Sequence, residues 1–222
     1  MLIKDIGRER KRRFPTGRTA RCGLILLLIC ALLGANLAAG ETAYAASGKK
    51  AAKKAYKAFL SEENELWCEG YYTTDKKTKF AVLDLNKDGV PELLVETGQG
   101  YGAGDASAMA VYAYVNGKVK FITSYNNTIG HYFYCNKAGG VEYYQDSNTI
   151  LYQSFNGKTM VTKAKVIIKY TGKSTYRSGN GKKISRKKFN AVLKNLQKNA
   201  KTQSSAKIRM YKNTKKNRNK YL

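Results

Sequence analysis

The sequence predicts an α+β fold: an N-terminal helix packed on an antiparallel β-meander of hairpins, then a short C-terminal helix and a basic tail. Three observations predict it. An amphipathic stretch at residues 49–67 has helical periodicity, strand-like runs joined by Asn-Gly dipeptides fill the middle, and a second amphipathic stretch follows Ser185. With 222 residues, the chain is long enough for one domain with extensions.

The segment at residues 1–45 has the three parts of a secretory signal peptide. Residues 1–21 hold eight Lys or Arg, residues 23–33 form an apolar core, and residues 43–45 (Ala-Tyr-Ala) provide a cleavage site. We therefore expect a secreted or cell-surface protein whose mature chain begins near Ala46. An uncleaved membrane anchor is the alternative, because the uncharged run continues to Gly40.

The expected domain spans residues 46–200. Its helix is predicted because Ala52, Tyr56 and Leu60 recur on one face. From residue 71 to residue 170 the chain alternates short strands with turns, and the Asn-Gly pairs at 116–117 and 156–157 each join two strands into a hairpin.

The domain is expected to close with a short helix that Ser185 caps. The apolar face of this helix contains Phe189, Val192, Leu193 and Leu196. After residue 200 the sequence becomes polar and strongly basic, so residues 201–222 are predicted to form a disordered basic tail.

Oxygen-bearing side chains recur at the spacing of a calcium loop in residues 84–92. Asp84, Asn86, Asp88 and Glu92 occupy positions 1, 3, 5 and 9, and the carbonyl of Val90 with water would complete the ligands of a Ca²⁺ ion. The glycine at position 6 permits a sharp turn. Position 12 is not the glutamate of a helix–loop–helix site, and the flanking runs have strand character, so we expect strand–loop–strand. The alternative is an ordinary hairpin turn.

Two of the four cysteines leave with the signal segment, and Cys68 and Cys135 remain. In an exported protein these two can form one disulfide, with two buried free thiols as the alternative. The single histidine, His131, lies in a strand-like run and is interpreted as a structural residue.

Charge is divided unevenly along the mature chain. Residues 46–146 carry twelve lysines and twelve acidic residues, whereas residues 147–222 carry 21 Lys or Arg and no acidic residue. This predicts an anionic partner, either a cell-wall polymer or membrane headgroups, unless the basic segment serves only solubility. Nucleic acid is disfavoured because the segment has no recognisable binding module or stacking platform. The candidate contact residues are Arg186, Lys187, Lys188, Lys215, Lys216, Arg218 and Lys220.

The run at residues 80–94, FAVLDLNKDGVPELL, resembles a known motif. It is the D-[LI]-[DN]-x-D-G-x-x-E-L motif of small secreted or surface proteins of Gram-positive anaerobic bacteria, which have an EF-hand-like calcium loop. It is also similar to the strand–loop–strand calcium loops of integrin-type propeller repeats. The resemblance extends over about residues 48–200 and implies calcium binding at the five loop positions. The similar proteins often have acids where this chain has residues 186–188, and the resemblance implies no established activity.

These patterns together predict a secreted calcium-binding structural or binding module that docks to an anionic surface polymer through its basic C-terminal part. A wall glycan-binding protein is one alternative, because Tyr112 and Tyr114 share one face of the strand at 111–115 and an exposed aromatic face can stack on sugars. A wall-acting hydrolase is another. Enzymatic activity is not expected, because most of the available carboxylates belong to the predicted ion site and no Ser/His/Asp arrangement is recognisable.

Overall fold

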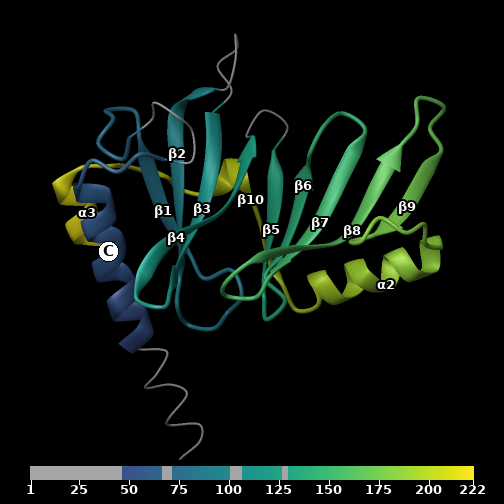
Figure 1. Ribbon diagram of the computed structural model, residues 1–222, viewed down its shortest axis with the longest axis horizontal. Helices are drawn as coiled ribbons and strands as arrows, with labels where there is room; N and C mark the ends of the chain where they lie inside the picture. Colours follow the sequence, from purple (N-terminus) through teal and green to yellow (C-terminus); the bar gives the residue numbers. More distant parts are fainter. Residues whose placement is uncertain (1–46, 67–71, 101–106, 127–129) are drawn as a thin grey trace, which may run out of the picture. The chain divides into compact units, whose positions relative to one another are not determined.

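The computed structural model describes residues 47–66, 72–100, 107–126 and 130–222. These residues form three α-helices and two antiparallel sheets, so the expected α+β class is confirmed (Figure 1). The predicted signal segment at 1–45 and Cys68 lie outside the described residues. Within the described residues, no helix is long and apolar enough to cross a membrane.

The strands divide into two sheets rather than one. The first sheet has the order β11-β1-β2-β3-β4 and contains β1 (Lys79–Leu83), β2 (Glu92–Gly100), β3 (Ser107–Val115), β4 (Lys118–Asn126) and β11 (Tyr211–Lys212). The second has the order β10-β5-β6-β7-β8-β9 and contains β5 (His131–Cys135), β6 (Gly140–Tyr144), β7 (Thr149–Phe155), β8 (Met160–Ile168), β9 (Ser174–Ser178) and β10 (Lys201–Ser204). Hairpin signals specify only neighbouring pairs, so they did not reveal the break between β4 and β5.

Both predicted Asn-Gly turns join the strands that the sequence indicated. Asn116 and Gly117 connect β3 to β4 with φ angles of 52° and 79°, which matches the tight turns that favour this dipeptide. The second connection, from β7 to β8, is longer, and there Oδ1 of Asn156 accepts the backbone N–H groups of Lys158 and Thr159. Local turn chemistry therefore predicts these strand pairs correctly.

The N-terminal helix covers one face of the first sheet. Its described helical residues are 47–61, and Ala52, Tyr56 and Leu60 are fully buried at a spacing of four residues. They pack with β-strand residues such as Phe80 and Leu93. The helix ends before residue 67, where the sequence analysis had placed its end.

The second amphipathic stretch forms α2 (Arg186–Gln197), as expected. Oγ of Ser185 accepts the amide of Lys188 and caps the helix. Phe189 and Leu196 are buried, and Phe189 contacts the rings of Tyr152 and Tyr176 on the second sheet at centroid distances of 5.3 and 4.8 Å. The apolar face of α2 thus packs where the sequence predicted an interior.

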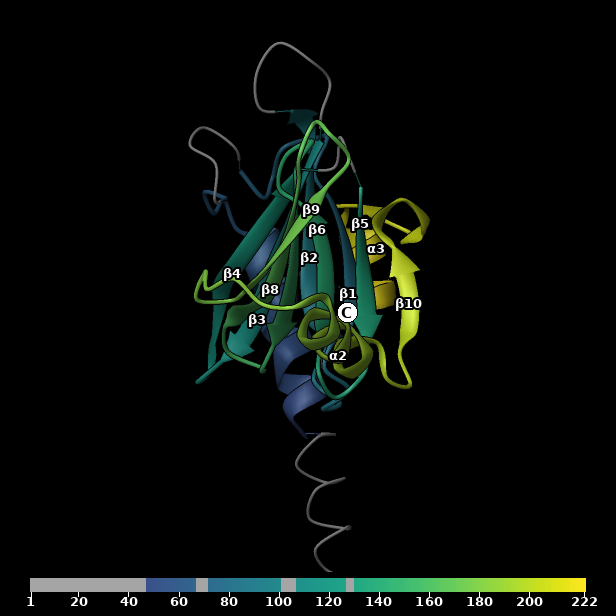
Figure 2. The ribbon, with the colours of Figure 1, turned by 90° about the vertical axis from the view of Figure 1, so that its right-hand side faces the viewer.

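The predicted disordered tail at 201–222 is wrong, because this segment forms regular structure. It contains β10, the 3₁₀ helix η1 (Ser205–Lys207), β11 and α3 (Lys215–Tyr221). Strand β10 pairs with β5 at the edge of the second sheet (Figure 2). Strand β11 pairs with β1 at the edge of the first sheet. Backbone pairing does not depend on apolar side chains, and Tyr221 and Leu222 add contacts to the helix–sheet core.

The two sheets share one hydrophobic core. Met109 and Val111 from the first sheet pack in the same cluster as Phe133, Val141 and Phe155 from the second. The C-terminal segment, which pairs with an edge of each sheet, connects the two sheets a second time.

Candidate functional site

The loop predicted to bind calcium connects β1 to β2, so the expected strand–loop–strand arrangement is confirmed. Leu83 pairs with Glu92 across its base. Inside the loop, Lys87 and Gly89 have positive φ angles of 57° and 88°. The glycine at position 6 therefore adopts the conformation for which the sequence analysis required it.

The three acids of the loop accept hydrogen bonds from the loop's own backbone. Oδ2 of Asp84 accepts the amide five residues on at 3.3 Å, and Oδ1 of Asp88 accepts the amide of Val90 at 2.8 Å. Oε2 of Glu92 accepts the amide of Leu85 at 2.8 Å. These bonds hold all three carboxylates to one short segment.

The carboxyl group of Glu92 lies in an unfavourable environment for a charge. The residue is only 3% exposed, and burial raises its pKa to about 8, with the charges of Asp88 and Asp84 adding to the effect against the opposing hydrogen bond from Leu85. Oδ1 of Asp84 is itself buried without a hydrogen-bond partner. Unpaired buried carboxylates destabilise a fold unless a cation or a proton compensates them.

The expected ligand atoms of the loop do not all face a common centre. In the described part of the chain, no group of three or more His, Cys, Asp or Glu side chains is placed to hold a metal ion. Nδ2 of Asn86 donates to Oδ2 of Asp88 at 2.8 Å, so this amide would have to turn before its oxygen could face an ion. Binding of an ion at the predicted ligands would therefore require side-chain rotations within the loop.

The loop contacts the N-terminal helix and the second sheet. The hydroxyl of Tyr56 donates to the carbonyl of Pro91 at 2.9 Å. From the second sheet side, the amide of Asn136 donates to the carbonyl of Leu85 at 3.2 Å. A Cβ atom at Gly157 would lie 3.5 Å from a carboxylate oxygen of the loop. The candidate site is thus located where three parts of the fold meet.

A cleft of about 800 Å³ adjoins the loop, and Lys87, Lys137, Lys198 and Lys201 line it. This set of lysines is not apparent in the sequence. Lys87, Lys137 and the neighbouring pair Lys198 and Lys201 come from three separate parts of the chain, and no local pattern relates these parts. The only available signal was the absence of acids after residue 146.

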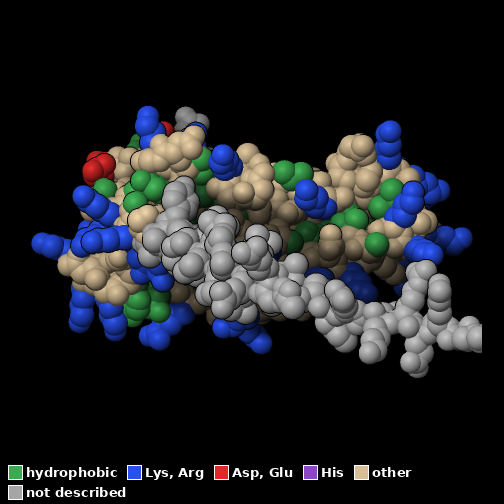
Figure 3. All heavy atoms as spheres, turned by 90° about the horizontal axis from the view of Figure 1, so that it is seen from below, with side chains coloured by type: hydrophobic (Ala, Val, Ile, Leu, Met, Phe, Trp, Pro, Cys, Tyr) green, Lys and Arg blue, Asp and Glu red, His purple; other side chains and the backbone are tan. Residues whose placement is uncertain are grey.

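The predicted anion-contact residues occupy two different elements. Arg186, Lys187 and Lys188 are exposed in the first turn of α2, and Lys215, Lys216 and Lys220 are exposed on α3. Arg218 differs, because its Nη1 donates to Oδ1 of Asn213 at 2.7 Å and to the carbonyl of Leu60 at 3.3 Å. Figure 3 shows one face of the molecule, on which Lys and Arg side chains are numerous and acidic ones few.

Cys135 is a free, buried thiol, which fits the free-thiol alternative for this residue. His131 is fully buried, contacts the rings of Tyr125 and Phe133 at 4.8 and 5.0 Å, and neither ring nitrogen has a hydrogen-bond partner. Burial lowers its pKa to about 4. A neutral, enclosed imidazole agrees with the structural interpretation of this histidine.

The tyrosine face of the strand at 111–115 is not available for glycan stacking. Tyr112 is 4% exposed, and its ring contacts Phe59 of the N-terminal helix at a centroid distance of 5.1 Å. Tyr114 packs against the same cluster. A helix covers this face, so it belongs to the core.

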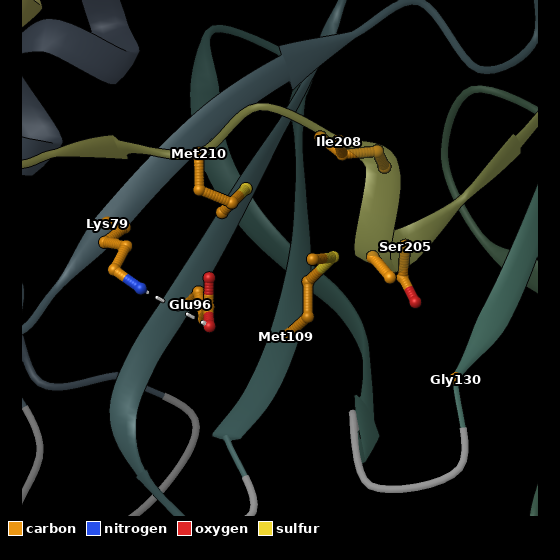
Figure 4. A pocket seen from close by; sticks show the side chains of 8 residues that line it. Lys79, Glu96, Met109, Gly130, Ser205, Ile208 and Met210 are labelled. Atoms are coloured by element: carbon orange, nitrogen blue, oxygen red, sulfur yellow. Dashed lines mark ion pairs between the residues drawn. The ribbon is translucent and has the colours of Figure 1, made fainter.

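A second cleft, of about 400 Å³, lies between β1–β3 and the C-terminal segment (Figure 4). Lys79 and Glu96, which pair between β1 and β2, form an ion pair in its wall at 3.8 Å. The sulfur-containing side chains of Met109 and Met210 line the cleft with Ile208. The one carboxylate in its lining is already paired with a lysine. This cleft therefore lacks the pair of free carboxylates that a glycoside hydrolase requires.

Comparisons with known proteins give no relative. No protein-family model matches the chain. No curated protein and no solved structure matches it either.

Proposed function

We propose that the protein is a secreted calcium-binding module, with the ion held in the loop at residues 84–92, that docks to an anionic surface polymer. The observation that carries the proposal is the crowding of three acidic side chains in one loop, in surroundings that disfavour their charge. Glu92 is buried beside two other carboxylates, and an oxygen of Asp84 is buried without a partner. A divalent cation would compensate all three acids at once.

The ligands we assign are the side-chain oxygens of Asp84, Asn86, Asp88 and Glu92 with the carbonyl of Val90. Water would supply the remaining positions, as in other calcium loops. An affinity in the range of extracellular modules, with a dissociation constant of about 10⁻⁴–10⁻³ M, is expected for such a site. The ion's role is structural, because the free energy of binding adds to the free energy of folding.

The docking role is supported by charge. The C-terminal segment at residues 147–222 carries 21 Lys or Arg and no acid, and most of these side chains are exposed. A net charge of this size attracts anionic polymers over distances of about 8–10 Å at moderate ionic strength. The secreted location rests on the signal-like segment at 1–45.

Calorimetric titration of calcium into the purified protein and into Asp88→Ala tests the metal site. We expect saturable one-site binding in the wild type and its loss in the variant. The melting temperature of Asp88→Ala should fall in calcium and change little in chelator. An equal fall of the melting temperature in calcium and in chelator would mean that Asp88 stabilises the turn and does not bind the ion.

A matched control separates the two roles. Oδ1 of Asp146 accepts the amide two residues on at 2.7 Å, as Oδ1 of Asp88 does at 2.8 Å, and both residues are exposed. Asp146→Ala therefore removes the same turn bond outside the loop. It should leave calcium binding unchanged.

A further inference from the structure

The cleft beside the calcium loop concentrates positive charge without a neutralising acid. Among the described residues, its lining contains Lys87, Lys137, Lys198 and Lys201 together with three asparagines and no Asp or Glu. All four lysines are exposed, and within the described part of the chain none of them forms an ion pair. Four like charges around one hollow repel each other, so their convergence favours an anionic ligand.

The positive lining continues beyond this cleft. A second hollow of about 440 Å³ shares Lys198 and Asn199 with it and adds Lys194 and Gln197 along α2. The second hollow also has no acidic lining residue. A continuous track of this kind suits a polymer with regularly spaced anions better than a single small ion.

One residue connects the track to the calcium loop. The backbone amide of Asn136 donates to the carbonyl of Leu85 in the loop at 3.2 Å. Its side-chain Nδ2 donates to the carbonyls of Leu196 and Lys198, at 2.8 and 2.9 Å, where α2 ends. Asn136 is 7% exposed and therefore fixes the end of α2, with Lys198, relative to the loop.

The acidic side chains of the loop and the lysines of the track both contribute to the electrostatic potential in the cleft. The thiol of Cys135 lines the cleft, and its pKa is raised by burial, lowered by the charges of Lys87 and Lys201, and raised by those of Asp84 and Glu92. In the absence of calcium the charge of Asp84 therefore offsets part of the lysine field. A divalent ion in the loop would remove this offset.

We propose that the track binds a phosphodiester polymer of the glycerol-phosphate type and that calcium in the loop strengthens this binding. The calcium part rests on the proposed function; the track itself does not. Lysine ammonium groups are point charges that suit monoanionic phosphates. No aromatic residue of the described ranges lines either hollow, so these residues offer no surface on which nucleic-acid bases could stack.

The test measures fluorescence anisotropy of a labelled poly(glycerol phosphate) oligomer with the full protein at fixed ionic strength. Two double variants remove the same charge: Lys198→Gln with Lys201→Gln in the track, and Lys215→Gln with Lys216→Gln on α3. We expect the track pair to weaken binding roughly tenfold and the α3 pair less than about twofold, because only the track lysines line the two hollows. Equal losses in the two variants would overturn the track. The four lysines that these variants replace are exposed, so both variants should have the melting temperature of the wild type.

The calcium arm repeats the titration with and without calcium on the wild type and on Asp88→Ala. The variant reports any direct effect of calcium on the polymer. An affinity increase of several-fold in the wild type alone supports the coupling, and equal changes in both proteins overturn it. If calorimetry shows no calcium binding, the proposed metal function fails, while the lysine variants still decide whether the track binds the polymer.

A thymidine oligonucleotide tests the identity of the polymer. Tighter binding of this oligonucleotide than of the glycerol-phosphate oligomer would replace the polymer assignment with nucleic acid.

Discussion

Glu92 is the residue whose chemistry most constrains the function. Its folded-state pKa of about 8 lies above the ordinary value of 4.5, so the calcium-free folded protein holds a proton there that the unfolded chain releases. The contribution of this group is therefore favourable at low pH and is lost as pH rises from about 4.5 to about 8. A shift of each pKa unit corresponds to about 1.4 kcal/mol.

We predict that Glu92→Gln removes this pH-dependent loss of stability. Melting temperatures in calcium-free buffer should fall between pH 5 and pH 8 less steeply in the variant than in the wild type. His131 acts in the opposite direction, because its lowered pKa makes stability decrease as pH falls from 6.5 toward about 4. Both proteins retain His131, so its contribution cancels when the melting temperature of one protein is subtracted from that of the other at each pH. Parallel curves would show that Glu92 is not protonated in the folded protein.

At the residue scale, the sequence predicted the capping role of Ser185 and the conformation of the loop glycine because both signals are local. The assignment of calcium ligands in the same loop stays a prediction. It did not identify Asn136, whose partners lie 60 and 62 residues away. A polar residue in a turn gives no sign in the sequence that it will be buried against a distant helix end.

At the element scale, α3 is the clearest departure from the sequence analysis. Its residues are mostly polar, yet Nζ of Lys53 donates to the carbonyl of Tyr221 at 2.9 Å and the ring of Tyr221 stacks on Tyr211 at 3.6 Å. Nδ2 of Asn213, just before α3, donates to the carbonyl of Leu60. Composition predicted disorder because it ignores bonds made by backbone carbonyls and contacts made by a few aromatic rings.

We predict that deletion of residues 215–222 lowers the melting temperature by several degrees, because it exposes part of the cluster around the N-terminal helix. The control is the double variant Lys215→Gln, Lys216→Gln, which changes charge at two exposed positions and should melt as the wild type does. Thermal unfolding followed by circular dichroism measures both. If the truncated protein were as stable as the full chain, the result would favour the predicted disordered tail instead.

At the scale of the whole molecule, the loop at residues 84–92 joins two strands of the first sheet and contacts the second sheet. The carbonyl of Leu85 in this loop accepts the amide of Asn136. In the turn that begins at Asn136, the carbonyl of Gly139 accepts the amide of Phe155 from β7 at 2.9 Å. A Cβ atom at Gly139 would lie 3.2 Å from Cβ of Asn86, so turn and loop are in close contact. The hairpins could be predicted strand by strand, but this meeting of sheets depends on contacts between residues about 50 positions apart, which no local pattern encodes.

A consequence is that calcium should stabilise the second sheet although its ligands belong to the first. We predict that hydrogen exchange in calcium slows at the amides of Asn136 and Phe155, as well as within the loop, because opening these bonds would require the loop to move. The β8–β9 turn at residues 169–173 serves as an internal reference, since its backbone bonds are made within the turn. Asp88→Ala should lose the effect at both amides. Protection confined to residues 84–92 would mean that the ion orders its own loop only, and the coupling between calcium and the lysine track would then lack its structural route through Asn136.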